Sequence, residues 1–305
     1  MKYFILFICI LIITFFVYKK LRLKQTFKEK QVDEYFFKDI KHLKDSSKRK
    51  LWIHLPSDMN SRDPSERGLT NKINSDYLLI CIKSIIDKCA NEYEIILFDD
   101  SNFNSLLPDT YVDLSKISGS LREHYRYISF LSILHKYGGV FLPCSLFLRK
   151  SFSHIDVPKT FFVSQLPNQG LSSSDDKYIY SLKIMGSTKE NPILGDFINK
   201  YKDIVKKDST NETIYFTEEL LRKMNIPSID PKMIGTKSKK DELILLDHLM
   251  QDQYIELNEK HIGIYIPHNE LLRRTNYNWF IYLNKEDVLE SQIFLSKYML
   301  TYSSK

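Results

Sequence analysis

Hydrophobic residues between positions 51 and 148 follow strand-like and helix-like spacings in alternation. Residues 51–55 and 93–98 are short apolar runs of the kind that forms buried strands. Between them, residues 71–88 carry apolar side chains four and five positions apart, which predicts an amphipathic helix. A strand, a helix and a second strand in this order predict a parallel βαβ unit and hence an α/β fold.

A second helix-like segment, residues 122–136, leads through Gly138 and Gly139 into the apolar run 140–142. Glycine can take the left-handed conformation that ends a helix, because it has no Cβ. Pro143 ends the strand, since proline has no N–H to donate to a sheet. Further along, the same patterns predict strands over 160–164 and 179–186 and helices over 192–206 and 218–224.

The most hydrophobic stretch is Tyr3–Tyr18, flanked by Lys2 and by Lys19-Lys20. It is somewhat shorter than the ~20 residues of a typical spanning helix, but flanking tyrosines and lysines can extend it into the membrane interface. A cleaved signal peptide is the alternative, although no pair of small residues follows the run. We interpret residues 1–18 as a single transmembrane anchor.

Charge separates the next segment from the rest of the chain. Residues 19–50 hold twelve Lys/Arg and five Asp/Glu, which gives this segment a net charge of +7. The whole chain has a net charge of +6. Because Lys2 adds +1, residues 51–305 carry a net charge of −2, which argues against a nucleic-acid partner. Residues 19–49 are therefore interpreted as a basic stalk, whose cations could also contact anionic lipid headgroups.

The basic residues follow the anchor, so the positive-inside rule predicts a cytosolic body. The four cysteines are far apart and form no CxxC motif, which excludes a zinc site and a disulfide framework. A luminal body stays possible, because Asn211-Glu212-Thr213 could accept a glycan there. The body itself is divided at 170 into two α/β halves of one domain, 50–170 and 171–305.

Polar groups follow the predicted strands at positions where α/β proteins bind ligands. Asp99 and Asp100 come directly after the 93–98 run, and ligands of open α/β sheets bind beyond the carboxyl ends of the strands. The two carboxylates could bind ribose hydroxyls or a cation, or they could cap the helix that starts near Ser101. His54, which shares a strand face with Trp52, could be a catalytic base or a core residue.

Glu123 and Arg126 lie three residues apart on the predicted helix 122–136, so they share one face and can form an ion pair. In the C-terminal half, Arg273, Arg274, Tyr277 and Trp279 are candidates for an acceptor or phosphate surface, because arginine binds phosphate and aromatic rings stack on sugars. Trp279 and Phe280 could equally belong to the core.

The helix, the Gly-Gly turn and the strand resemble glycosyltransferases with a DxD sugar-binding motif, the α-mannosyltransferase-like and capsular-polysaccharide-synthesis group. Glu123, Arg126, Tyr127, Tyr137, Gly138 and Gly139 carry this resemblance. It implies a Rossmann-like GT-A fold that binds a nucleotide sugar, with Asp99, Asp100, Glu123, Arg126, Gly138, Gly139 and Ser145 around the donor.

The two metal-linked aspartates of that motif are replaced by Pro143 and Ser145, so no DxD is present. A divalent metal is therefore not expected at these positions. Either Arg or Lys bears the phosphate charge, or Asp99, Asp100 or Glu123 holds a displaced ion, or binding persists without activity. The Tyr-Gly-Gly-Val-x-x-Pro-x-Ser pattern also resembles membrane-anchored proteins of large DNA viruses.

Together these features predict a membrane-anchored glycosyltransferase that moves a sugar from a nucleotide sugar to a glycan or glycoprotein. The alternative is a catalytically inactive binding or scaffold protein of a viral or membrane assembly. The catalytic residues themselves cannot be assigned from the sequence.

Overall fold

The computed structural model describes residues 32–45, 47–55, 75–110, 112–168, 176–210 and 213–303. The chain divides into two compact units, residues 1–36 and 37–305. Of the first unit only 32–36 are described, and they form a short helical turn. The predicted anchor Tyr3–Tyr18 and residues 19–31 of the basic stalk lie outside these ranges. Within them, no helix is both long and apolar enough to cross a membrane.

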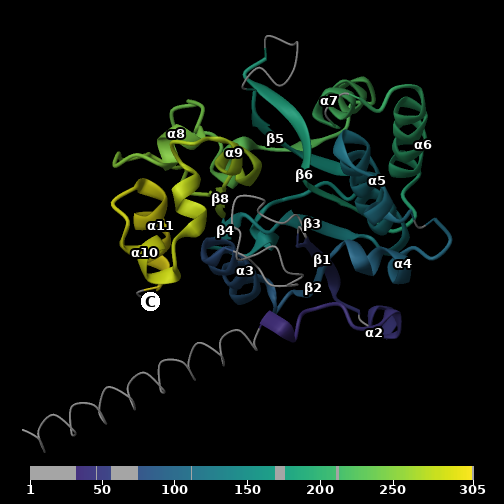
Figure 1. The fold of residues 1–305 in the computed structure, drawn as a ribbon, viewed down its shortest axis with the longest axis horizontal. Coiled ribbons are helices and arrows are strands. Elements are labelled where there is room, and N and C mark those ends of the chain that lie inside the picture. The colour runs from purple at the N-terminus through teal and green to yellow at the C-terminus, as the bar shows by residue number, and fades with distance from the viewer. Residues whose placement is uncertain are drawn as a thin grey trace, which may run out of the picture. The chain divides into compact units, whose positions relative to one another are not determined.

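The second unit is built on a six-stranded mixed sheet with the order β2-β1-β3-β6-β5-β7 (Figure 1). Its strands are β1 (Arg49–His54), β2 (Tyr93–Phe98), β3 (Gly139–Pro143), β5 (Phe162–Pro167), β6 (Tyr178–Ser187) and β7 (Ser228–Ile229). β1 pairs in parallel with β2 and β3, and β6 runs antiparallel to both β3 and β5. The predicted α/β class and the parallel β1-α3-β2 unit are therefore confirmed.

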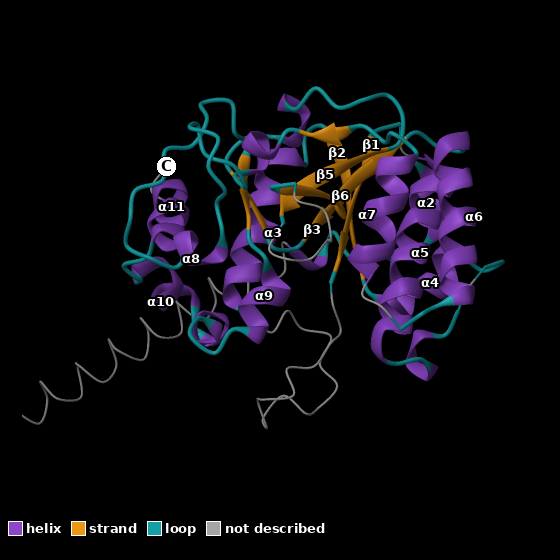
Figure 2. Cartoon of the chain, turned by 90° about the horizontal axis from the view of Figure 1, so that it is seen from above, coloured by secondary structure: helices purple, strands orange, loops and turns teal. Residues whose placement is uncertain are grey.

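Helices cover both faces of the sheet, as Figure 2 shows, with α5, α6 and α7 on one side and α3, α9, α10 and α11 on the other. The longer helices are α3 (Asp76–Cys89), α5 (Gly119–Tyr137), α6 (Pro192–Lys207), α7 (Thr213–Lys223) and α11 (Phe294–Ser303). The short ones are α2 (Ile40–Asp45), α4 (Phe103–Leu106), α8 (Leu246–Leu249), α9 (His268–Arg273) and α10 (Lys285–Glu290). A second, two-stranded sheet pairs β4 (Leu146–Leu148) with β8 (Gly263–Tyr265).

The main core lies between the sheet and helices α5, α6 and α7. Trp52 on β1, Phe98 on β2 and Phe141 on β3 point to this side and pack against Phe130 of α5. Removing such aromatic side chains from water is the main stabilising contribution to the unit. On the other face, α3 buries the free thiols of Cys81 and Cys89.

Residues on both sides of position 170 belong to one sheet, because β6 pairs with β3 and β5. This pairing also fixes the two edges of the sheet that matter for function. At the carboxyl edge, the parallel strands β1, β2 and β3 end at His54, Phe98 and Pro143. At the opposite, amino edge they begin.

Candidate functional site

The structure divides the predicted site residues between the two edges of the sheet. Asp99 and Asp100 follow β2 at the carboxyl edge, and Ser145 follows β3 there. Gly138 and Gly139 start β3 at the amino edge. Twelve residues of α5 separate Arg126 from Gly138, which is about 18 Å along a helix axis. Arg126 and Gly138, which the resemblance places around one donor, therefore lie at opposite edges of the sheet.

Asp99 is a helix cap. Its Oδ1 accepts hydrogen bonds from the Ser101 N–H at 2.8 Å and from Ser101 Oγ at 2.5 Å. The Asp99 N–H in turn donates to Asn102 Oδ1 at 2.9 Å, which completes a capping box around the first turn. The sequence left two interpretations open, ligand binding and helix capping. Helix capping holds for Asp99.

Asp100 is the centre of a buried charge network. Arg126 donates from Nε to Oδ1 at 3.0 Å and from Nη2 to Oδ2 at 2.7 Å, a side-on bidentate pair. His54 Nε2 lies 2.8 Å from Oδ1, and Arg122 Nη2 lies 3.3 Å from Oδ2. These four contacts use the acceptor directions of the carboxylate, so Asp100 has no lone pair left for a metal ion.

The network keeps Asp100 ionised. Burial alone raises the pKa of this carboxyl group, but hydrogen bonds from His54 and Arg126, and their charges, outweigh burial and hold the pKa well below its usual 3.8. The side chains of Arg126 and His54 are only 5% and 7% exposed. His54 is thus a buried partner of Asp100, stacked on Phe103 with ring centroids 6.0 Å apart.

Glu123 completes the network from one turn earlier on α5. Its Oε1 accepts a hydrogen bond from Arg126 Nη1, so the predicted ion pair on the helix face is confirmed. Glu123 is 41% exposed, the most open member of the group. Arg126 therefore has both ends of its guanidinium engaged by carboxylates and acts as a fixed strut between α5 and the end of β2.

The side chains at the positions of the missing DxD aspartates include no carboxylate. Ser145 is buried, and its Oγ donates to the Ile266 carbonyl at 2.8 Å while Ile266 N–H donates back to the Ser145 carbonyl at 3.0 Å. Burial raises the pKa of the Cys144 thiol to about 12, so it stays neutral. Pro143 offers no ligand atom. Across the described part of the chain, no group of three His, Cys, Asp or Glu side chains is arranged to bind a metal.

Lys183 lies on β6, the strand that pairs with β3, and sequence patterns did not identify it. β3 pairs with β6 through Gly139–Ser187, Val140–Gly186 and Phe141–Met185. Continuing this register brings Lys183 opposite Pro143. Lys183 acts to lower the pKa of the Cys144 thiol, although burial outweighs this effect.

A β-bulge aims the Lys183 side chain. The pairing of β5 with β6 steps from Val163–Met185 to Ser164–Ser181, which leaves residues 182–184 of β6 without a partner in β5. Ser164 Oγ holds the bulge by donating to the Ser181 carbonyl at 3.1 Å and accepting from Ile184 N–H at 3.3 Å. Bulges beside binding sites commonly redirect one side chain in this way.

Two tyrosines surround the Lys183 ammonium. Its Nζ lies 5.4 Å from the ring centre of Tyr127, one residue after Arg126. Desolvation alone lowers the pKa of Lys183, but Tyr127, Tyr265 and Glu123 more than offset this effect and raise it above its usual value. Burial raises the pKa of Tyr265 to about 12, although Lys183 acts in the opposite direction. Lys183 is thus charged, and the Tyr265 phenol is neutral, at neutral pH.

Gly138 and Gly139 are explained by backbone geometry at the amino edge. Gly138 ends α5 with φ of +69°, and its carbonyl accepts from Trp52 Nε1 at 2.9 Å. Gly139 has φ of +109°, and a Cβ there would lie 2.4 Å from the Lys50 carbonyl oxygen. The sequence correctly predicted a glycine turn that ends the helix. Neither glycine lies at the edge that holds Asp100 and Lys183.

The C-terminal candidates form a structural cluster. Arg274 makes a bidentate pair with Asp247 at 2.6 and 2.7 Å and also contacts Glu270 at 3.0 Å. Tyr277 donates to Asp247 at 2.8 Å. Phe280 is fully buried, as one interpretation expected, whereas Trp279 is 41% exposed and not part of the core. Since the Arg274 guanidinium is already engaged, this cluster is a weaker candidate for phosphate binding than Lys183.

No family model matches the chain, and no curated protein is similar to it in sequence. Several solved structures with a similar fold are glycosyltransferases. They include LgtC, a galactosyltransferase solved with donor and acceptor sugar analogs (11% identity, TM-score 0.35, covering 61% of this chain and 75% of that chain). Mouse xyloside xylosyltransferase 1 is 9% identical (TM-score 0.39, 63% and 88% covered).

The bifunctional glycosyltransferase WbbM is 9% identical to the chain, with a TM-score of 0.42 over 85% of this chain and 52% of that chain. At identities and TM-scores this low, function has to be argued from the residues of the chain itself.

Proposed function

We propose that this protein is a GT-A-like glycosyltransferase that takes its sugar from a nucleotide sugar and uses Lys183 in place of a divalent metal. The observation that supports the proposal is the register of β3 with β6, which on continuation brings Lys183 opposite Pro143 at the carboxyl edge. An α/β sheet binds ligands at this edge. A fixed positive charge there suits an anionic diphosphate.

In such a transfer the bond between the sugar C1 and the phosphate oxygen breaks, C1 bonds to a hydroxyl oxygen of the acceptor, and the hydroxyl proton passes to the departing diphosphate. The nucleoside diphosphate leaves with the electron pair of the broken bond, so negative charge grows on its phosphate oxygen. Lys183 would stabilise that charge from a position fixed by the bulge, and Tyr127 and Tyr265 could donate hydrogen bonds beside it.

The Asp100 network has a supporting role in this proposal. It holds Arg122, Glu123 and Arg126 in place on α5, next to Tyr127. Glu123, the exposed member, is the group best placed to contact hydroxyls of the donor. Asp100 itself is a positioning residue, because its carboxylate is saturated by protein donors.

The acceptor would be a glycan or glycoprotein, and the predicted anchor Tyr3–Tyr18 would keep the enzyme on a membrane with its body in the cytosol. These two parts of the proposal rest on the sequence alone.

The test is a calorimetric titration of the full-length protein with UDP-, GDP- and CMP-sugars in the presence of EDTA. One donor is expected to bind without metal. Lys183→Met is expected to weaken binding of this donor about tenfold, which corresponds to a loss of ~1.4 kcal/mol of binding free energy. Methionine keeps the length of the side chain and removes its charge. Lys200→Met, at a 52% exposed position on α6, is the matched control and should bind like the wild type.

Binding that requires manganese would refute the role of Lys183 and leave the enzyme class intact. No binding to any nucleotide sugar would refute the enzyme itself.

A second function is supported by one observation: Asp99 caps a helix and Asp100 is saturated, so neither carboxylate is available as a catalytic base. A catalytically inactive, nucleotide-sugar-binding or scaffold protein would look the same at these residues. Binding of a donor without any transfer or hydrolysis would favour this second function.

A further inference from the structure

The amino edge of the sheet carries a basic pocket that the proposed transferase site does not use. Its cavity has a volume of about 350 Å³ and is lined from four segments, residues 48–50, 137–139, 157–159 and 187–189. These segments are the start of β1, the Gly-Gly turn, the loop before β5 and the end of β6. The pocket therefore lies at the opposite edge of the sheet from Asp100 and Lys183.

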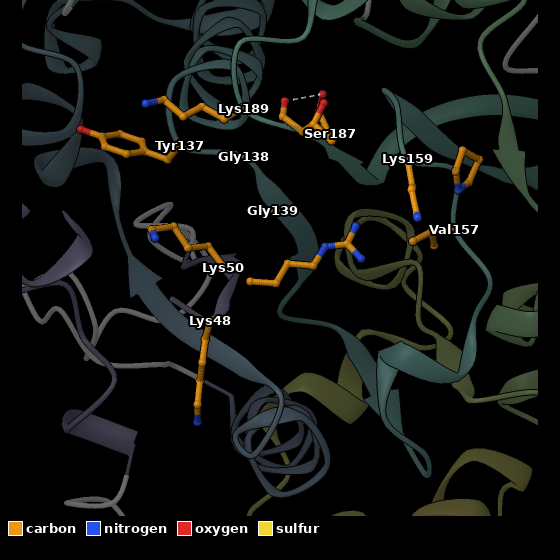
Figure 3. A pocket seen from close by; sticks show the side chains of 12 residues that line it. Lys48, Lys50, Tyr137, Gly138, Gly139, Val157, Lys159, Ser187 and Lys189 are labelled. Carbon is orange, nitrogen blue, oxygen red and sulfur yellow. Dashed lines mark hydrogen bonds between the residues drawn. The ribbon is translucent and has the colours of Figure 1, made fainter. Parts of the chain in front are cut away.

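Five of the twelve residues that line the basic pocket are cationic, and none of these lining residues is acidic. The cations are Lys48, Arg49, Lys50, Lys159 and Lys189. Figure 3 shows that Lys50, Lys159 and Lys189 lie on three separate segments around the pocket. Residues so far apart in sequence gather there only because the fold brings them together.

Carboxylates offset part of this charge from outside the pocket. Glu94 pairs with Lys50 at 3.3 Å, and Glu190 pairs with Lys189 at 3.4 Å. Both side chains of the Lys189–Glu190 pair are more than 60% exposed, so Glu190 offsets little of the positive charge of Lys189. The C-terminal end of α5 adds about half a negative charge. Five cations exceed the sum of these opposing charges, so the pocket favours an anion.

The Gly-Gly turn builds this pocket. A Cβ on Gly138 would lie 2.9 Å from the Lys189 nitrogen, and a Cβ on Gly139 would lie 2.4 Å from the Lys50 oxygen. Only glycine lets the segments that carry Lys50 and Lys189 approach the turn this closely. The Glu190 N–H also donates to the His135 carbonyl at 2.7 Å, which fixes the turn after β6. The pocket is thus held by backbone contacts and is present before a ligand arrives.

We propose that the basic pocket binds a ligand with several clustered phosphate groups. Arg49 can bind one phosphate through two N–H groups, and the flexible lysines can contact others. The volume matches a small phosphorylated ring and not a polymer. Two sources have this chemistry, a phosphorylated inositol lipid and a soluble inositol phosphate. Lys48, Arg49 and Lys50 are the last residues of the basic segment 19–50, which follows the predicted membrane anchor in the sequence. Their place in this segment favours the lipid as the ligand.

The test uses the full-length protein and the double variant Lys159→Ala/Lys189→Ala. Both lysines are exposed, so their removal should leave the fold intact. Soluble inositol trisphosphate is titrated by calorimetry, and phosphatidylcholine vesicles with and without phosphatidylinositol bisphosphate are compared for binding. Each lysine near clustered phosphates contributes about a factor of five, so the variant should bind about 30-fold more weakly.

The matched control is Lys206→Ala/Lys207→Ala, which removes two exposed lysines from the C-terminal end of α6. It should bind like the wild type if the pocket is the site. Lys183→Met should also bind like the wild type, because it lies at the opposite edge. The Lys183→Met measurement separates the basic pocket from the proposed donor site. The phosphate-binding proposal and the proposed function can therefore fail independently of each other.

Tight binding of the soluble ligand supports the proposal, and binding only to the phosphoinositide vesicles supports it with the lipid as the source. Binding of neither ligand, or equal weakening by the pocket variant and the control variant, would overturn it.

Discussion

Replacing Asp100 by Asn tests the buried charge network most directly. The change keeps the size of the side chain and removes its charge. Asn can still accept one hydrogen bond from His54 or Arg126, but its NH₂ group then faces the Arg126 Nη2 donor, 2.7 Å away in the wild type. Arg126, with a side chain only 5% exposed, would keep Glu123 as its remaining anionic partner in this network.

The expected cost follows from this burial. Removing one partner of a buried ion pair typically destabilises a protein by 3–5 kcal/mol, and the lower end applies because Glu123 still balances Arg126. We expect Asp100→Asn to lower the free energy of unfolding by about 3 kcal/mol. For a domain of this size, that loss corresponds to a midpoint about 6–12 °C lower.

The assay is urea and thermal unfolding of the full-length protein at neutral pH, followed by tryptophan fluorescence. Asp99→Asn is the matched control at the neighbouring position. Asn caps helices about as well as Asp, so this variant should lose only a few tenths of a kcal/mol. If Asp100→Asn were no less stable than Asp99→Asn, the network would not hold the fold as described.

The same variant should lose its effect in acid. The folded-state pKa of Asp100 lies below its usual value of 3.8, because the donations from His54 and Arg126 outweigh burial. The unfolded chain therefore takes up this proton first as pH falls, and the stabilising contribution, complete at neutral pH, is lost on acidification. The difference between wild type and Asp100→Asn should shrink between about pH 5 and pH 3. A difference that stays constant over this range would contradict the assigned ionisation.

Two further predictions concern the Gly-Gly turn and the replaced DxD positions. Gly139→Ala should destabilise the protein by about 3 kcal/mol or more, since it adds both a clash with Lys50 and an unfavourable φ. Gly119→Ala, where φ is +63° but no atom lies within 4 Å of the new Cβ, should cost only about 1 kcal/mol; equal losses in thermal unfolding would contradict the packing argument. Ser145→Asp should lower the midpoint of unfolding, because it buries a carboxylate and removes the bond to Ile266, and manganese should not restore stability. Stabilisation of this variant by manganese would show that a metal site can form there.

Local patterns in the sequence were sufficient for several elements of the second unit, but they did not predict β4, β7, β8 or the helices after α7. The apolar run 93–98 is β2, Pro192 begins α6, and the helix ahead of the Gly-Gly pair ends at Tyr137. Each of these features depends on neighbouring residues only, through side-chain spacing or a special backbone conformation. Such features can be read from a sequence without knowing the fold.

The candidate site depended on contacts that local patterns do not encode. Gly138 and Arg126 belong to one motif, but α5 carries them to opposite edges of the sheet. Asp99 and Asp100 are adjacent, yet one caps a turn and the other binds His54 and Arg126.

Lys183 depends on the antiparallel register of β3 with β6 and on a bulge, and neither can be derived from spacing. The one available signal was a single cation inside the otherwise uncharged run 178–187. A lone charge in a strand of this kind deserves to be treated as a site candidate, because burying an unpaired charge is costly.

The central claim is sugar transfer without a metal, and the measurement that tests it is turnover of the nucleotide sugar identified by binding. Release of the nucleoside diphosphate by the full-length protein is followed in EDTA and in manganese, for the wild type and for Lys183→Met. We predict equal wild-type rates in both buffers and a rate about a hundredfold lower for Lys183→Met, the usual cost of removing one fixed charge-stabilising group. Turnover that appears only with manganese, or that is unchanged in Lys183→Met, would contradict the account.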